Sequence, residues 1–331
     1  MADVKEYICD KNERLDTFLA SKISQTRSQV AHLIKQGAVS VDDKCVTRPG
    51  VKLKEEQKIS IVFPQAQTKE IDQNFMQETS WAKEVKIIYE DEELIVINKP
   101  SGVTVHPAPS VKEPTLVDWL KYQGMSLSTI SGEERHGIVH RLDKGTSGAM
   151  VVAKSNEAHE FLSKQLQDKS MGRYYLAIIT PPLKDDLTTV EANIARSASN
   201  RLKMASGLAH GKYAKTQFKQ LALSGDAKLQ LVACKLFTGR THQIRVHLES
   251  LNRHIMGDHI YALAPKNAQS ERIMLHAYII YFTHPITKKR IEFKAELDTS
   301  VQQFLEEKFD MESANEILAA KHIVECFTTD T

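Results

Sequence analysis

Cysteine is scarce in this chain, with four residues among 331. The four lie far apart and form no C-x-x-C pair: Cys9, Cys45, Cys234 and Cys326. Such spacing argues against a disulfide framework and against a zinc site built from cysteines. Long apolar runs are also missing. The chain begins with MADVKEYICDKNERLD, which has no signal-peptide core, and no later run approaches the length of a membrane span. We therefore expect a reducing, cytoplasmic setting and no contact with a membrane.

Charge of one sign is not in excess either, since 44 Lys and Arg face 42 Asp and Glu, for a formal net charge of +2. A total so close to neutral says little about partners, so the distribution of charge along the chain is more informative. Hydrophobic residues make up 41% and charged residues 26%, which is typical of a globular protein. The length is sufficient for one large domain with a smaller one attached.

The chain divides into a small N-terminal module and a large domain, joined by a polar segment. In residues 1–63, two segments have the apolar spacing of short helices, RLDTFLASK and TRSQVAHLIKQG, and two have strand patterns, AVSVDDK and KISIVF. Residues 64–81 are polar and lack periodicity, which predicts a linker. Strand patterns with intervening helices fill residues 82–310, and residues 311–331 predict a tail with a short helix and a loose end. The expected fold class is α+β, with a mainly antiparallel, extended sheet in the large domain.

Basic residues gather in three segments in spite of the near-neutral total. The first lies along or just after the second helix pattern of the module, with Arg27, Lys35 and Lys44. The second runs from residue 192 to residue 225, contains no acid, and includes Arg201 and Lys203. The third, GRTHQIRVHLESLNRH, adds Arg240, Arg245 and Arg253. Any one of them is most simply a solvated surface, but three together favour phosphate binding, and nucleic acid is the expected partner.

Six blocks stand out between residues 81 and 300: INKPSGVTVHP, HRLDKGTSGAMVVAK, GRYYLAII, LFTGRTHQIRVHL, IMGDHIY and LHAYIIYFTHPIT. In this order they resemble the RluA-type pseudouridine synthases, which isomerise uridine in RNA. Residues 14–62 are similar to the S4 RNA-binding module. The combination of an S4-like module with this catalytic domain resembles the ribosomal large-subunit pseudouridine synthases of types C and D.

The resemblance implies a catalytic site. Conversion of uridine to its C5-linked isomer breaks the N1–C1′ glycosidic bond, turns the base and rejoins it through C5. By resemblance, Asp143 is the carboxylate that acts as nucleophile or base, and Arg245 is its ion-pair partner. Tyr175 matches the tyrosine that stacks on the base and helps to remove the C5 proton. Arg141 is expected to fill the space that the flipped uridine leaves.

Further residues of these segments are expected to contact RNA: His140, Arg240, Arg27, Lys35, Arg201 and Lys203. The reaction involves no redox step, group transfer or hydrolysis, so we expect neither a cofactor nor a metal. His140, His242 and His247 could suggest a metal site, but they form no H-x-x-x-H set.

Other interpretations stay open at this point. On spacing alone, an acid before Lys-Gly, such as Asp143, is most often a turn residue. The whole protein could instead be a non-catalytic RNA-binding protein of ribosome assembly, or a synthase that acts on transfer RNA. The presence of Asp143, Arg245 and Tyr175 favours an enzyme, and the S4-like module favours large-subunit ribosomal RNA. We expect a monomer, and the sequence does not choose which covalent intermediate Asp143 forms.

Overall fold

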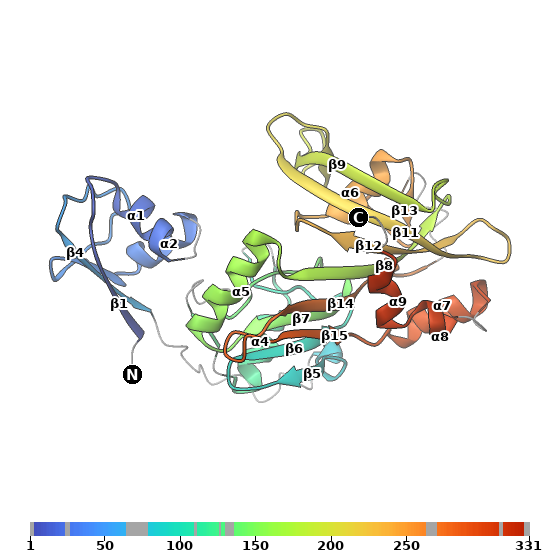
Figure 1. The fold of residues 1–331 in the computed structure, drawn as a ribbon, viewed down its shortest axis with the longest axis horizontal. Helices are drawn as coiled ribbons and strands as arrows, with labels where there is room; N and C mark the ends of the chain where they lie inside the picture. The colour runs from blue at the N-terminus through green and yellow to red at the C-terminus, as the bar shows by residue number, and fades with distance from the viewer. Residues whose placement is uncertain are drawn as a thin grey trace.

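A computed structural model describes residues 3–23, 27–63, 79–108, 111–125, 127–129, 136–262, 270–310 and 314–327. Two sheets with separate apolar cores account for the described part of the chain (Figure 1). Residues 64–78, which make up most of the expected linker, lie outside the described residues. No helix within the described ranges is long and apolar enough to cross a membrane.

Residues 3–63 form a four-stranded antiparallel sheet with two helices. Across the sheet the strands are β1 (Asp3–Ile8), β4 (Lys58–Phe63), β2 (Val39–Val41) and β3 (Lys44–Cys45). The helices are α1 (Leu15–Lys22) and α2 (Arg27–Lys35). Alternation along β4 buries Ile59, Ile61 and Phe63 against α1 and α2, as the KISIVF pattern predicts.

Strand β1 has no counterpart among the elements expected from the sequence. Its two aliphatic residues Val4 and Ile8 are 49% and 69% exposed, so the strand directs them away from the core. The alternation that usually marks a half-buried strand is therefore inverted here. Pairing with β4, in register from Asp3 with Phe63 to Ile8 with Lys58, holds β1 in the sheet instead.

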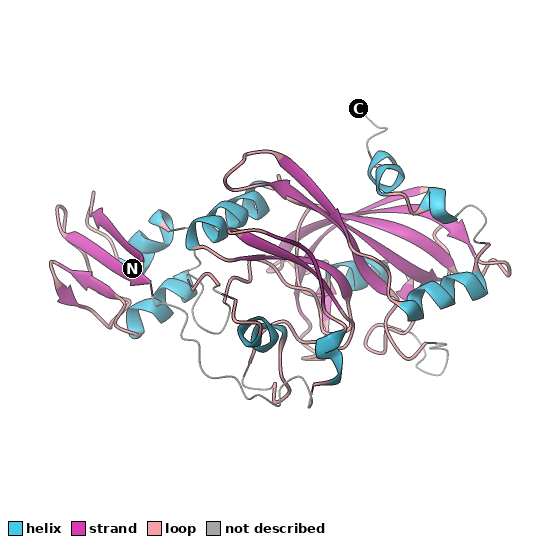
Figure 2. Cartoon of the chain, turned by 90° about the horizontal axis from the view of Figure 1, so that it is seen from below, coloured by secondary structure: helices cyan, strands magenta, loops and turns pink. Residues whose placement is uncertain are grey.

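The large domain is built on an 11-stranded sheet, which Figure 2 shows as a continuous band. In order across it, the main strands are β10 (Met204–Ser206), β9 (Leu187–Arg196), β11 (Lys212–Leu223), β12 (Gln230–Leu236), β8 (Gly172–Thr180), β14 (Leu275–Thr283), β7 (Ser147–Ala153), β6 (Leu94–Lys99) and β5 (Lys86–Glu90). The two remaining strands are β13 (His254–Ile255), paired with β8, and β15 (Arg290–Lys294), paired with β14. Among the pairings of the described strands, only β14 with β7 is parallel. The expected α+β class with a mainly antiparallel, extended sheet is confirmed.

Helices cover both faces of this sheet. They are η1 (Ser80–Lys83), α4 (Leu116–Tyr122), α5 (Asn156–Asp168), α6 (Gln243–Ser250), α7 (Thr299–Lys308), α8 (Ala314–Ile317) and α9 (Ala320–Glu325). Alternate residues of β7 enter different cores: Met150 and Val152 belong to the main core, while Val151 belongs to the core that α5 covers. Burial on both sides explains why β7 consists of small and apolar residues alone.

The C-terminal segment is packed more firmly than its sequence suggests. A short helix with a loose end is expected after residue 311; helices α8 and α9 are present, and α9 buries Ile323 completely in the main core. The Tyr278 hydroxyl on β14 also donates a hydrogen bond of 2.6 Å to the Leu318 carbonyl. The described residues 314–327 thus cover the sheet as part of the large domain.

The N-terminal module lies at the α5 side of the large domain (Figure 1). One ion pair bridges the two parts, from Lys5 Nζ on β1 to Glu160 Oε1 on α5, at 2.8 Å. Ion pairs of this partly exposed kind contribute little to stability.

Candidate active site

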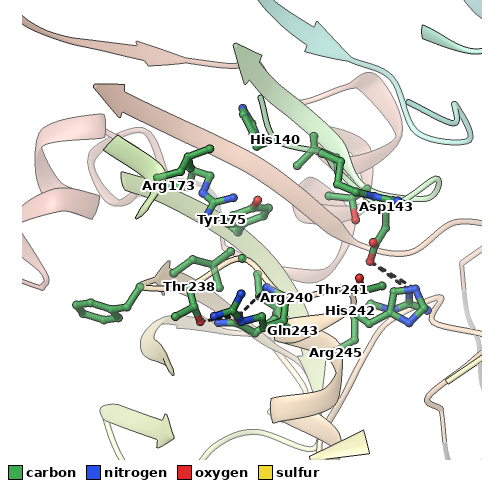
Figure 3. Close-up of a pocket in the computed structure, with 18 of the residues that line it drawn as sticks. His140, Asp143, Arg173, Tyr175, Thr238, Arg240, Thr241, His242, Gln243 and Arg245 are labelled. Carbon is green, nitrogen blue, oxygen red and sulfur yellow. Dashed lines mark hydrogen bonds and ion pairs between the residues drawn. The ribbon is translucent and has the colours of Figure 1, made fainter. Parts of the chain in front are cut away.

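A cavity of about 550 Å³ opens where the loop before β7, strand β8 and the loop before α6 meet (Figure 3). Its lining includes all the expected catalytic residues and three of the expected RNA contacts: Asp143, Tyr175, Arg245, Arg141, His140 and Arg240. These residues come from three regions that are far apart in the sequence. The order of strands β12, β8, β14 and β7 brings the regions together at one place on the sheet.

Asp143 lies in the loop that leads into β7. The Thr146 N–H donates to the Asp143 carbonyl at 3.0 Å and closes a turn, so Asp143 is a turn residue as well as a pocket residue. Its side chain is 20% exposed. Lys99, fully buried beneath this loop, donates from its amine to three carbonyl oxygens, those of Pro100, Val103 and Lys144. Burial lowers the pKa of Lys99 to about 7, while the charge of Asp143 acts in the opposite direction.

Arg245 projects from the first turn of α6 and holds two acids at once. Its Nε and Nη2 bind the two carboxylate oxygens of Asp258 at 2.7 and 2.8 Å, and its Nη1 lies 3.4 Å from Asp143 Oδ2. The expected pair of Arg245 with Asp143 is therefore present, but as the longer and weaker of the two contacts. The bidentate partner is Asp258, which the sequence reasoning missed although it lies in the IMGDHIY block.

Asp258 is 2% exposed and is also held by the backbone N–H groups of Ile260 and Tyr261. Burial acts to raise the pKa of Asp258, but the hydrogen bonds and charge of Arg245 outweigh it and hold the pKa below its ordinary value. The Arg245 guanidinium also lies over the Tyr261 ring, 4.8 Å from its centroid. Arg245 is thereby fixed in one orientation, with Nη1 directed at Asp143.

His242 is a second neighbour of Asp143 that the sequence reasoning did not assign to the site. It precedes α6 in the left-handed region, with φ of 57°, and its Nε2 lies 3.9 Å from Asp143 Oδ2. Its Nδ1 is hydrogen-bonded to the Tyr261 hydroxyl at 2.9 Å. Burial lowers the pKa of His242, against the charge of Asp143, so the imidazole is neutral at pH 7.

Tyr175 lies on β8 and lines the cavity, with 5% of its surface exposed. Burial raises the pKa of the Tyr175 phenol, so the phenol keeps its proton at neutral pH. A buried, protonated tyrosine is suited to stacking on a nucleobase. It is less suited to removing a proton, which would require a phenolate.

The two residues before Leu142 differ sharply. His140 is 8% exposed, its Nε2 accepts the Val151 N–H at 3.1 Å, and burial lowers its pKa to about 3. It is therefore a neutral, packed histidine that lines the cavity, and a charge-based contact with RNA is not open to it. Arg141 is exposed at the same cavity, as expected for a group that meets RNA.

The loop before α6 is held by Gln243, another residue whose role the sequence did not reveal. Its buried amide accepts from the Arg240 N–H and donates to the Lys215 carbonyl, each at 3.0 Å. The exposed Arg240 side chain donates from Nε to the Tyr213 carbonyl at 3.0 Å. The sequence does contain a pattern that could have pointed to Gln243. It is a polar residue on the inward face of an amphipathic helix, and a buried polar side chain needs hydrogen-bond partners within the protein.

The remaining expected RNA contacts lie away from this cavity. Arg27 and Lys35 are exposed on α2, and Arg27 forms an ion pair of 2.9 Å with Asp16. Arg201 is exposed in the turn between β9 and β10. Lys203 binds Glu249 at 3.1 Å and lies over the Tyr261 ring.

The acid-free segment is less free of counter-charge than its sequence suggests. Acids outside residues 192–225 partner three of its lysines: Lys203 with Glu249, Lys215 with Glu191, and Lys219 with Asp186. Part of the segment is strand β10, which pairs with β9. The segment therefore carries less excess positive charge than its sequence indicates, because acids from other parts of the chain pair with some of its lysines.

Arg173 also lines the cavity, two residues before Tyr175 on β8, and was not predicted. It is 9% exposed, and its Nε is buried without a hydrogen-bond partner. Within the described ranges, no group of three or more His, Cys, Asp or Glu is placed to hold a metal ion.

Comparison with known proteins agrees with this geometry. Residues 93–250 match the family model of RNA pseudouridylate synthase, and residues 13–59 match the S4 domain. An RNA pseudouridine synthase of Helicobacter pylori strain J99 is 45% identical over 320 residues, covering 95% of this chain and 96% of that protein. Ribosomal large subunit pseudouridine synthase D of Zymomonas mobilis is 38% identical over 302 residues, covering 87% of this chain and 92% of that protein.

Among solved structures, human RNA pseudouridylate synthase domain containing 4 has a similar fold. The TM-score is 0.54 at 23% identity, over 70% of this chain and 97% of that one. Because the sequence identity extends over nearly the whole chain, this protein belongs to the RNA pseudouridine synthase family and carries an S4 domain at its N-terminus.

Proposed function

We propose that this RNA pseudouridine synthase modifies specific uridines in large-subunit ribosomal RNA, with Asp143 as its catalytic carboxylate. The proposed RNA target is supported by the 38% identity of this chain to a ribosomal large subunit pseudouridine synthase D, along 87% of the chain. Two further relatives of the same description, from Neisseria meningitidis, are 36% identical over 304 residues. Transfer RNA is less favoured as the target, because all three of these relatives are named for the ribosomal large subunit.

The proposed role of Asp143 rests on how Arg245 is shared. Two of the three guanidinium nitrogens of Arg245 serve Asp258, and the third stays 3.4 Å from Asp143. Asp143 thus has a cation beside it without being locked in a bidentate pair, so its oxygens remain available to attack the sugar or the base. Tyr175 stacks on the flipped uracil, and Arg141 fills the space that the base leaves in the RNA.

In this proposal, the cations outside the cavity add affinity through phosphate contacts. Arg240 flanks the opening, Arg201 and Lys203 lie along the β9–β10 turn, and Arg27 and Lys35 act from the S4 module. The domains extend over residues 1–63 and 82–310, with a linker at 64–81 and, at 311–331, a tail whose described part packs on the large domain. The enzyme acts as a cytoplasmic monomer without cofactor or metal.

The test uses two RNAs transcribed in vitro with tritium at C5 of uridine, because C5 loses its hydrogen when the new carbon–carbon bond forms. One is unmodified large-subunit ribosomal RNA and the other is a mixture of transfer RNAs. Label release from the ribosomal RNA, with chelator present, is the expected result. Release from transfer RNA alone would contradict the proposed target. Comparison of pseudouridines in ribosomal RNA from cells with and without the protein identifies the uridines.

A further inference from the structure

The Arg173 guanidinium is a buried charge without a protein counter-charge. The side chain lines the catalytic cavity and is 9% exposed, yet none of the ion pairs formed by the described residues includes it. The guanidinium lies beside the neutral Tyr175 hydroxyl, where burial raises the pKa of that phenol and the guanidinium acts to lower it, but the Nε of Arg173 is shielded from solvent and donates no hydrogen bond. By contrast, Arg245 is buried to the same degree and is held by Asp258 on two sides.

A guanidinium in this state makes the free protein less stable, because a buried charge needs a partner to offset its loss of water. Arrangements of this kind occur where a ligand supplies the missing acceptor. The cavity that Arg173 faces is the one that receives the uridine in the reaction of this family. Arg173 is therefore poised for an acceptor on the bound nucleotide.

The position of Arg173 indicates which part of the nucleotide it meets. Arg173 and Tyr175 are two residues apart on β8, so their side chains leave the same face of the strand. Figure 3 shows both directed into the cavity, side by side. A base stacked on Tyr175 would accordingly have its edge within reach of the Arg173 guanidinium.

Burial separates Arg173 from the cations that suit phosphates. Arg141, Lys169 and Arg240 line the same cavity but are exposed, where a solvated RNA backbone would pass. Gly239 leaves room for the inner guanidinium, since a Cβ at that position would lie 2.9 Å from Arg173 Nη2. The loop before α6 is thus shaped around Arg173 in its buried position.

We propose that Arg173 donates hydrogen bonds to the carbonyl oxygens of the flipped uracil and stabilises the negative charge that develops when the base detaches. When the N1–C1′ bond breaks, its electron pair stays with the base and gives a uracil anion, with charge spread over N1, O2 and O4. C1′ is left as an oxocarbenium ion beside the Asp143 carboxylate, or bonded to that carboxylate, which C5 then displaces. C5 of the uracil anion forms the new bond to C1′, N1 gains a proton and C5 loses one to solvent. A fixed guanidinium favours the anion during the turn of the base. This role rests on the proposed site around Asp143.

The experiment compares three variants, Arg173→Met, Arg173→Lys and Gly239→Ala, with the intact enzyme. Arg290→Met serves as the matched control, because Arg290 is an exposed arginine over the Tyr281 ring, away from the cavity. The measurements are single-turnover tritium release at saturating RNA, RNA affinity in an Asp143→Asn background that cannot turn over, and the melting temperature. The RNA is whichever of the two transcripts the intact enzyme modifies, so an error about the target would not affect the comparison.

We expect Arg173→Met to slow bound-state release by about a hundredfold, the loss seen when one oxyanion donor is removed. RNA affinity should change less than about threefold, and the melting temperature should stay level or rise because an unpaired buried charge has gone. Arg173→Lys should regain part of the rate, Gly239→Ala should lose part of it by displacing the guanidinium, and Arg290→Met should behave like the intact enzyme.

Two other results would overturn the proposal. A normal bound-state rate with weakened affinity and a salt slope flattened by about 1 would make Arg173 a phosphate contact. A lower melting temperature in Arg173→Met, restored in Arg173→Lys together with the rate, would make it a structural residue. Label release by the Asp143→Asn variant would instead contradict the proposed catalytic role of Asp143. It would leave the measured effect of the Arg173 substitutions as a separate result.

Discussion

The S4 module and the catalytic cavity both use basic residues, but they hold them in opposite ways. Arg27 and Lys35 of the module are exposed, and the module's apolar core is separate from them. In the cavity, Arg245 and Arg173 are at most 9% exposed, and Lys99 is fully buried under the catalytic loop. The module thus presents these charges to solvent, while the catalytic domain, besides its exposed cations, holds three in the interior of the fold.

The difference follows from what each region has to do. Phosphate binding needs long-range attraction, which exposed cations supply and salt weakens. Bond breaking needs charges that are already oriented, and burial both fixes them and strengthens their effect. Substitutions in the cavity should accordingly change the chemical step or the stability of the fold, whereas substitutions in the module should change RNA capture.

The largest effect is expected at Asp143. Asp143→Asn keeps the shape of the side chain but removes the charge, so tritium release should fall at least about a thousandfold. Binding to the RNA should stay within about tenfold, or 1.4 kcal/mol. Asp143→Glu should also lose roughly a hundredfold, since its carboxylate is displaced by one methylene. Loss of binding together with activity would mean that Asp143 serves the fold and would break the contrast between the two regions.

Asp258 gives the largest expected effect on stability. Asp258→Asn leaves the buried Arg245 charge without its bidentate partner, which should cost about 3 to 5 kcal/mol in the free energy of unfolding, measured by urea titration. Activity should fall as well, because Arg245 loses its fixed orientation toward Asp143. The control is Glu113→Gln, which removes an exposed ion pair with Lys144 and should leave the unfolding transition unchanged. Equal effects from both variants would contradict the assignment of Asp258 as a buried support.

Removal of residues 1–78 should sharpen the contrast. The half-saturating RNA concentration should rise at least about tenfold, since the module supplies a second, tethered set of contacts. Single-turnover release at saturating RNA should stay within about twofold, because the two parts have separate cores and a single Lys5–Glu160 ion pair is described between them. A collapse of the bound-state rate would show that the module helps to shape the active site.

The smallest effect concerns the β9–β10 turn. Arg201→Gln should flatten the slope of log K against log salt by about 1, as loss of one phosphate contact does. Lys203→Gln should flatten it less, because Glu249 already shares the charge of Lys203 at 3.1 Å. Filter binding at several salt concentrations measures both slopes. Unchanged slopes for both variants would make the turn an ordinary solvated surface.

Much of the secondary structure could be read from local patterns. The KISIVF strand and the helix that begins after Ser155 were predictable, because apolar spacing and an N-cap are local signals. Strand β1 could not be read in this way, since Val4 and Ile8 face solvent and pairing with β4 decides its conformation. A short helix in the C-terminal tail was predictable, but the packing of α9 in the main core was not, because its core contacts come from distant strands.

By itself, the sequence determined the fold class, the family and the residues Asp143, Tyr175 and Arg245, because the blocks that carry them are contiguous in the chain. Only the tertiary structure decided how these residues are supported. It placed Asp258 rather than Asp143 as the bidentate partner of Arg245, withdrew His140 from solvent, and left Arg173 buried without an acid. Burial and pairing depend on groups that approach from elsewhere in the chain, so a local pattern can name a charged residue without showing whether its charge is satisfied.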